Sequence, residues 1–167
     1  MTTHTIRLDL PWSCPPLSMN DSGASRGAMF AKAAKRREIR ETVAIIGRAE
    51  GVPTNVAHVT VQLHYRPRDN RARDTDNLTA TLKPICDALT PSRMVGRKYY
   101  PGCAMVIDDT PRFMAKNEPI IHPAERGAGG AMWLVLTWKP RDPSPHTDQA
   151  PKIAPAAHAG AGIEVPE

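Results

Sequence analysis

The residues that could do chemistry in this chain gather in one acidic stretch. Asp74 and Asp76 stand close together, Asp87 follows them, and Asp108–Asp109 come as a pair. Carboxylates that converge repel one another, and burying them is costly unless a cation is bound. Mg²⁺ prefers oxygen ligands of this kind, often carboxylates together with the phosphate of a substrate. The pattern therefore indicates a metal-dependent reaction at a phosphate group.

A basic segment directly precedes these acids. Its arginines are Arg66, Arg68, Arg71 and Arg73. The whole chain has a formal net charge of +5 and a pI of about 9.4. This excess favours a polyanionic partner, although a merely solvated surface would have the same composition. Together with the acids, it predicts a nuclease that uses Mg²⁺, with Mn²⁺ as a substitute.

A helix predicted from Asp74 to Leu89 positions the acids. Successive helical residues turn by about 100°, so residues about two or three turns apart share a face. Asp76, Lys83 and Asp87 have such spacings and should line one ridge. The opposite, apolar face should pack on a sheet; it comprises Leu78, Leu82, Ile85, Cys86 and Leu89. Pro84 removes a backbone hydrogen bond and predicts a kink.

Each of these residues also has an ordinary structural interpretation. Asp74 could only cap the helix, and Asp76 could only be an acid favoured at a helix N-terminus. Lys83 and Asp87 could form a surface ion pair, and Asp108–Asp109 could form a turn. Two acidic clusters that bracket one helix, with arginines beside them, favour the functional interpretation.

The remaining patterns predict an α+β fold in a single domain, a mixed β-sheet with two main helices packed on it. Strands are expected over residues 5–10, 59–65, 113–121 and 132–138, and the run from Lys116 to Pro119 weakens the third of them. The other helix is expected over residues 28–50 and carries Lys35 and Arg36 on its outer side. A long connection over residues 91–102 carries Arg97 and Lys98.

Composition separates a folded domain over residues 1–140 from a tail over residues 141–167. Residues 140–167 contain six prolines and no aromatic residue, which predicts a Pro/Ala-rich disordered segment. Three cysteines without a CxxC pair or a signal peptide favour reduced thiols in a cytoplasm. No membrane partner and no small-molecule cofactor are expected. The histidines lack zinc-site spacing, and His64 is expected to be solvated on the polar side of its strand.

The order of these motifs resembles the RusA family of Holliday junction resolvases, in particular versions encoded by bacteriophages of actinobacteria. The resemblance rests on Arg73-Asp74-Thr75-Asp76-Asn77-Leu78, Lys83, Asp87-Ala88-Leu89-Thr90, Asp108-Asp109, and the opening Leu10-Pro11-Trp12 and Pro15-Pro16. It implies a homodimeric, Mg²⁺-dependent endonuclease that resolves four-way DNA junctions by paired nicks. Such an enzyme would serve DNA recombination, repair or phage DNA processing in the cytoplasm of a bacterial host.

The resemblance also implies roles for individual residues. Asp74, Asp76 and Asp109 would be the catalytic, metal-binding acids, with Asp108 in support and Lys83 as a cationic catalyst. The family lysine usually stands where this chain has Ala80, and the loop before Asp108 is longer than usual. The cations expected to contact DNA are Arg66, Arg68, Arg71, Arg73, Lys35, Arg36, Arg97 and Lys98. Two other functions stay open: a non-catalytic DNA-binding protein of the same fold, and a phosphohydrolase that acts on nucleotides.

Overall fold

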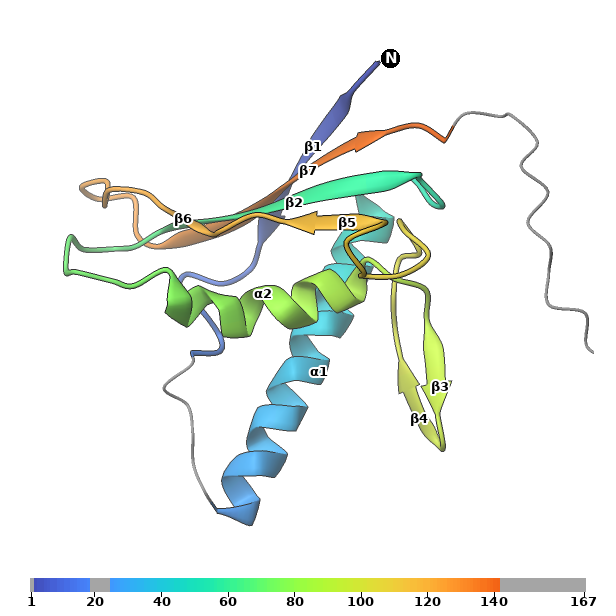
Figure 1. Cartoon of the computed structure of the whole chain (residues 1–167). Coiled ribbons are helices and arrows are strands. Elements are labelled where there is room, and N and C mark those ends of the chain that lie inside the picture. The colour runs from blue at the N-terminus through green and yellow to red at the C-terminus, as the bar shows by residue number, and fades with distance from the viewer. Residues whose placement is uncertain (1, 19–24, 142–167) are drawn as a thin grey trace, which may run out of the picture.

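Alternation of apolar and polar side chains builds the sheet. Every second side chain is buried along most of β2 (His58–Arg66) and β7 (Ala131–Lys139). β7 pairs antiparallel with both β2 and β1 (His4–Leu10), whereas β5 (Met114–Lys116) and β6 (Ile120–Ile121) pair in parallel with β2. The computed structural model describes residues 2–18 and 25–141, and within them the predicted mixed sheet is confirmed (Figure 1).

Two helices, α1 (Arg26–Ala49) and α2 (Asp76–Ala88), lie on the same face of the sheet (Figure 1). The sheet and both helices contribute to one apolar core, in which the largest fully buried side chains are Leu8, Ile39, Val43, Leu63, Leu78, Ile85, Leu89, Met105, Met114, Met132, Leu134 and Leu136. The predicted α+β class, with two main helices packed on a mixed sheet, is therefore confirmed.

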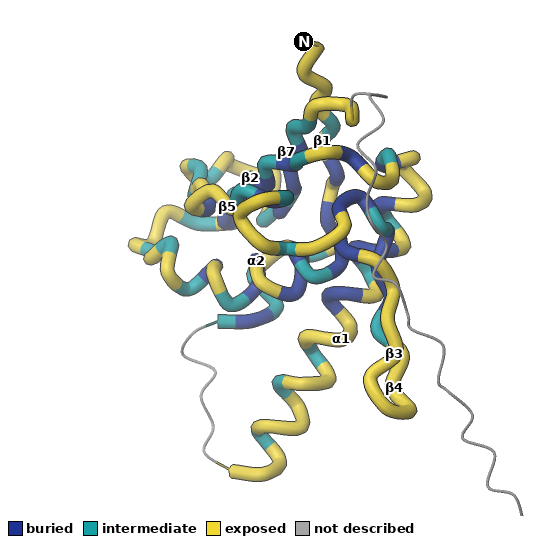
Figure 2. Tube along the Cα trace, turned by 45° about the vertical axis from the view of Figure 1, so that its right-hand side comes forward, coloured by how far each residue is buried: buried dark blue, intermediate teal, exposed yellow. Residues whose placement is uncertain are grey.

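Only the C-terminal half of α1 reaches this core. The buried residues of α1 begin at Ile39, whereas Met29 and Phe30 in its first turns are exposed. The N-terminal half extends away from the body and is exposed along most of its length (Figure 2). Ser25 begins the helix, because its side chain accepts a hydrogen bond from the backbone N–H of Ala28.

The faces of α2 are as the sequence predicts. Leu78, Leu82, Ile85 and Cys86 are buried, whereas Lys83 on the opposite ridge is exposed. Burial raises the pKa of the Cys86 thiol to about 12, so this cysteine stays protonated and unreactive at neutral pH. The predicted ridge is therefore present, and its apolar side anchors it to the sheet.

The long connection predicted over residues 91–102 contains two strands that the sequence analysis did not predict. The segment forms a hairpin of β3 (Arg93–Val95) and β4 (Lys98–Tyr100) that projects from the body (Figure 1). Gly96 has a φ of +60° at the turn, a conformation that favours glycine and closes short hairpins. The strands are short and largely exposed, so they carry no buried pattern by which the sequence could have revealed them.

The predicted strand over residues 113–121 is present but divided into β5 and β6. Residues 117–119 interrupt it, and Pro119 cannot donate to the sheet. The predicted tail over residues 141–167 lies outside the described residues except for Arg141. Within residues 2–18 and 25–141, no helix combines the length and apolar character that crossing a membrane requires.

Candidate functional site

Asp74 and Asp76 stand together where the chain enters α2. A side-chain oxygen of Asp74 accepts a hydrogen bond from the backbone N–H of Asp76 at 3.1 Å, so Asp74 satisfies a donor at the start of the helix. Both residues are exposed. The positive end of the helix dipole favours negatively charged residues at this position. This pair can offer oxygen ligands to a cation that arrives from solvent.

Glu118 approaches the same end of α2, although the sequence interpretation did not include it. Its Oε1 accepts a hydrogen bond from Thr75 Oγ1 at 2.8 Å, and its carbonyl oxygen accepts one from Gln62 Nε2 at 2.6 Å. The segment between β5 and β6 therefore brings a further acid to Thr75, at the start of α2. The available signal was an acid directly before Pro119, within the segment that interrupts the strand.

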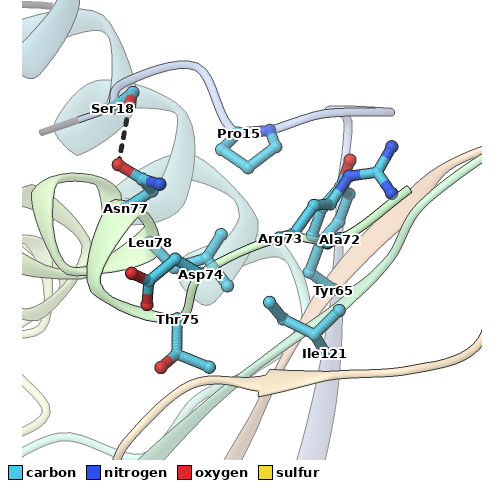
Figure 3. A pocket seen from close by; sticks show the side chains of 10 residues that line it. All are labelled: Pro15, Ser18, Tyr65, Ala72, Arg73, Asp74, Thr75, Asn77, Leu78 and Ile121. Carbon is cyan, nitrogen blue, oxygen red and sulfur yellow. Dashed lines mark hydrogen bonds between the residues drawn. The ribbon is translucent and has the colours of Figure 1, made fainter. Parts of the chain in front are cut away.

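A cavity of about 730 Å³ opens beside this acidic end of α2. It is lined by Pro15, Ser18, Tyr65, Ala72, Arg73, Asp74, Thr75, Asn77, Leu78 and Ile121 (Figure 3). Ser18 Oγ donates a hydrogen bond to Asn77 Oδ1 at 3.2 Å, which joins the N-terminal loop to α2. The side chains of Arg73 and Asp74 point to different sides, so the cavity combines a cation and an anion that do not neutralise each other.

Asp109 lies at the other end of α2. Asp109 stands shortly before β5, in which Met114 pairs with Val59 at the start of β2. The chain reverses direction between β2 and α2, so the end of α2 lies beside the start of β2 (Figure 1). A cavity of about 220 Å³ is lined by Asp87, Asp108 and Asp109 together with Arg93. Asp76 and Asp87 are separated by about 16 Å along the helix axis. The fold therefore divides the predicted acids into two groups.

Lys116 holds the carboxylate of Asp109. Lys116 Nζ donates to Asp109 Oδ2 at 2.7 Å. This hydrogen bond lowers the pKa of Asp109, and the positive charge of Lys83 acts in the same direction. Lys83 itself is exposed and makes no hydrogen bond or ion pair within the described residues, so the alternative of a Lys83–Asp87 ion pair is not realised. Lys83 and Asp109 thus share one end of α2.

The number and position of the carboxylate ligands decide which acids fit a magnesium ion. Asp74 and Asp76 fit an ion held by two carboxylates and completed by oxygens of a substrate phosphate. Asp108 and Asp109 instead line a cavity with Asp87, near the other end of α2. Within residues 2–18 and 25–141, no three His, Cys, Asp or Glu side chains are arranged to hold a metal ion. The arrangement therefore suits an ion that binds together with its substrate.

The basic loop before α2 is partly committed to its own structure. Arg73 Nη2 donates to Asp69 Oδ1 at 2.6 Å, and Arg66 pairs with Glu125. Arg68 and Arg71 are exposed, and only their neighbour Asp69 pairs with Arg68, at 3.6 Å. Of the four arginines predicted to contact DNA, Arg68 and Arg71 are the better placed to do so.

The other predicted DNA contacts lie on α1 and on the hairpin. Lys35 Nζ pairs with Glu38 Oε2 at 2.9 Å, whereas Arg36 lines a cavity between α1 and α2. Arg97 and Lys98 are exposed on the β3–β4 hairpin. Of these four cations, Arg36 lines a cavity together with Lys83 and Asp87 of α2.

The prediction that His64 is solvated is wrong. His64 is half-buried, with Nδ1 2.9 Å from Nε2 of His122, and its ring is nearly parallel to that of Trp133. Burial lowers the pKa of His64, and the neighbouring His122 and Arg7 lower it further. These residues lie on the face of the sheet opposite the helices, and His122 arrives there from the segment after β6, which the pattern of β2 alone could not reveal.

No model of a known protein family matches the chain, and a search of curated proteins finds no match.

Proposed function

We propose that the protein is a Mg²⁺-dependent, structure-selective endodeoxyribonuclease that resolves four-way DNA junctions by paired nicks. The observation that carries this proposal is the ridge of α2: Asp74 and Asp76 stand at its start, and Lys83 and Asp87 further along it line a cavity with four arginines. A phosphodiester backbone that follows the ridge meets acids able to hold a metal and cations able to hold phosphates. The order of these residues also resembles the RusA family.

The residues would divide the work as follows. Asp74 and Asp76 would hold the ion, and a bound ion would supply an acidified water molecule and offset negative charge on the phosphate. Lys83 lies about 10 Å further along the helix axis than Asp76 and would attract the phosphate backbone through its positive charge. Arg68 and Arg71 attract the DNA and fix its register without reading its sequence.

A specific observation favours the second candidate, a non-catalytic DNA-binding protein of the same fold. Asp109 is bonded to Lys116 and lies at the far end of α2 from Asp76, so the expected group of three acids is divided. Under this alternative, Asp109 serves only to fix the loop before β5, and DNA binding relies on the cations.

Cleavage of a radiolabelled four-way junction under single-turnover conditions separates these functions. With Mg²⁺ or Mn²⁺, the wild-type chain should nick the junction in symmetric pairs and leave linear duplex and free nucleotides intact. Asp76→Asn should lose nicking by at least about 10²-fold, because it removes a charged ligand of the ion. Its affinity for the junction should be equal or higher, since a negative charge near phosphate is removed.

The control variant is Glu50→Gln, an exposed acid at the end of α1 that should nick normally. Wild-type nicking by Asp76→Asn would reject the metal role of that acid. Tight junction binding without any metal-dependent cleavage by the wild-type chain would favour the non-catalytic candidate.

Paired nicks also require two sites in a fixed relation, which a dimer with twofold symmetry provides. The proposal therefore includes a homodimer formed by the folded domain. Light scattering on a chain that ends at residue 140 should give twice the monomer mass. A monomer that still cuts in pairs would contradict this part of the proposal.

A further inference from the structure

A second cavity, between α1, α2 and the β3–β4 hairpin, is strongly basic. Its volume is about 270 Å³, and its cationic lining residues are Arg36, Arg37, Arg40, Lys83 and Arg93. Among the described residues that line it, Asp87 alone is acidic. Like charges brought together in this way repel one another unless an anion joins them. The excess of positive charge therefore points to an anionic ligand.

Most of these cations are not committed to a carboxylate. Arg37 lies 3.9 Å from Glu41, a loose pair on the outside of α1. Arg36 makes no hydrogen bond or ion pair within residues 2–18 and 25–141, and Arg93 has only a ring contact, 6.0 Å from the centre of Tyr100. Guanidinium groups without a carboxylate partner keep their N–H donors available, and the planar arrangement of these donors matches the oxygens of a phosphate.

Arg40 fixes the wall of the cavity. It is only 3% exposed, and it donates to the carbonyl of Pro101 through Nε and to Thr90 Oγ1 through Nη2. Burial lowers the pKa of Arg40, an effect that Asp87 opposes and Arg93 strengthens. Because Thr90 and Pro101 belong to the two stems of the hairpin, Arg40 ties both stems to α1. The hairpin is thus held against the helix, and the cavity is formed before any ligand arrives.

We propose that this cavity binds one phosphodiester group of the DNA backbone, held by Arg36 and Arg93 in front of Arg40. The inference rests on the proposed function and adds the place where the substrate strand is anchored. A volume of about 270 Å³ accommodates a phosphate with its sugar but not a duplex, and the ring of Tyr100 offers a surface for the sugar. The anchored phosphate lies near Lys83 and Asp87, beyond the metal-binding pair along the ridge.

Binding measured without metal tests this inference independently of cleavage. Fluorescence anisotropy of a labelled four-way junction in EDTA would compare the wild-type chain with Arg36→Gln, Arg93→Gln and the double variant. Each single replacement should weaken binding about tenfold or more, the scale of one charged hydrogen bond. Each should reduce the slope of log affinity against log salt by less than about 0.9, because the other arginine still contacts the phosphate.

The double variant gives the decisive result. Because both arginines hold the same phosphate, the double variant should lose that one contact and reduce the salt slope by about 0.9 in total. A reduction of the salt slope near 1.8 would contradict a single shared phosphate, since it would mean that the two arginines contact separate phosphates. Unchanged affinity in the double variant would overturn the site altogether.

Two further arms complete the test. Arg7→Gln removes the same charge on the sheet face opposite the helices and should leave affinity within about twofold of wild type, in line with a long-range effect screened by salt. An equal loss in Arg7→Gln would overturn the inference, because only net charge would then matter. Sodium pyrophosphate that displaces the junction at micromolar concentration would instead assign the cavity to a free phosphate ligand. A chain that binds as expected but never nicks would reject the proposed catalysis and leave this site standing.

Discussion

Gly102 lies where the two stems of the β3–β4 hairpin pass closest to each other. A Cβ added to Gly102 would lie 1.9 Å from the carbonyl oxygen of Thr90 and 2.9 Å from the carbonyl carbon of Pro91. Both are backbone atoms of the opposite stem, which cannot rotate away as a side chain can. Replacement by alanine must therefore separate the stems by roughly 1 Å or more to restore ordinary contact distances.

The cost of Gly102→Ala follows from these contacts. Overpacking of this kind costs about 1–3 kcal/mol. The backbone of Gly102 also makes two hydrogen bonds, because its N–H donates to Ser92 Oγ at 3.0 Å and its carbonyl accepts from Arg48 Nη2 at 2.6 Å. Separation of the stems in the variant would strain both bonds. Loss of one such bond adds about 1 kcal/mol. We expect Gly102→Ala to lower the free energy of unfolding by about 2–4 kcal/mol.

Equilibrium urea denaturation followed by tryptophan fluorescence measures this loss. The matched control is Gly27→Ala in α1, where nothing lies within 4 Å of the added Cβ. That change should leave stability unchanged or raise it by up to about 1 kcal/mol, because alanine favours the helix. Equal midpoints for Gly102→Ala and the wild-type chain would refute the close approach of the stems and with it the fixed wall of the basic cavity.

Three further predictions concern the charged residues. Lys83→Ala should reduce single-turnover nicking of a junction by about 10²-fold, the typical loss of one transition-state donor. Because Lys116 holds the folded pKa of Asp109 below its ordinary value of 3.8, their pairing stabilises the fold above that pH. The stability lost in Lys116→Met, measured by urea denaturation, should therefore be present at neutral pH and vanish as the pH falls below 3.8; a constant loss would refute the pairing. Replacing Arg68 and Arg71 by glutamine should lower the salt slope of junction binding by about one each, and an unchanged slope would move the DNA surface elsewhere.

The sequence alone determined the elements whose pattern repeats over a few residues. Alternation along β2 and β7 and the apolar face of α2 depend on which side of one element meets the core, and neighbouring residues fix that side. The same local rule placed Lys83 on the exposed ridge of α2. The interruption of the strand before Pro119 was also visible, because proline cannot donate to a sheet.

Only the tertiary structure decided how residues distant in the sequence meet. The parallel pairing of Met114 with Val59 carries Asp109 to the end of α2 and away from Asp76, a consequence of strand register that no local spacing contains. Glu118, in the segment between β5 and β6, is brought to Thr75 by the same strand pairing. The β3–β4 hairpin has exposed strands, so contacts with Arg40 and Arg48 of α1, rather than burial of its own side chains, hold it in place.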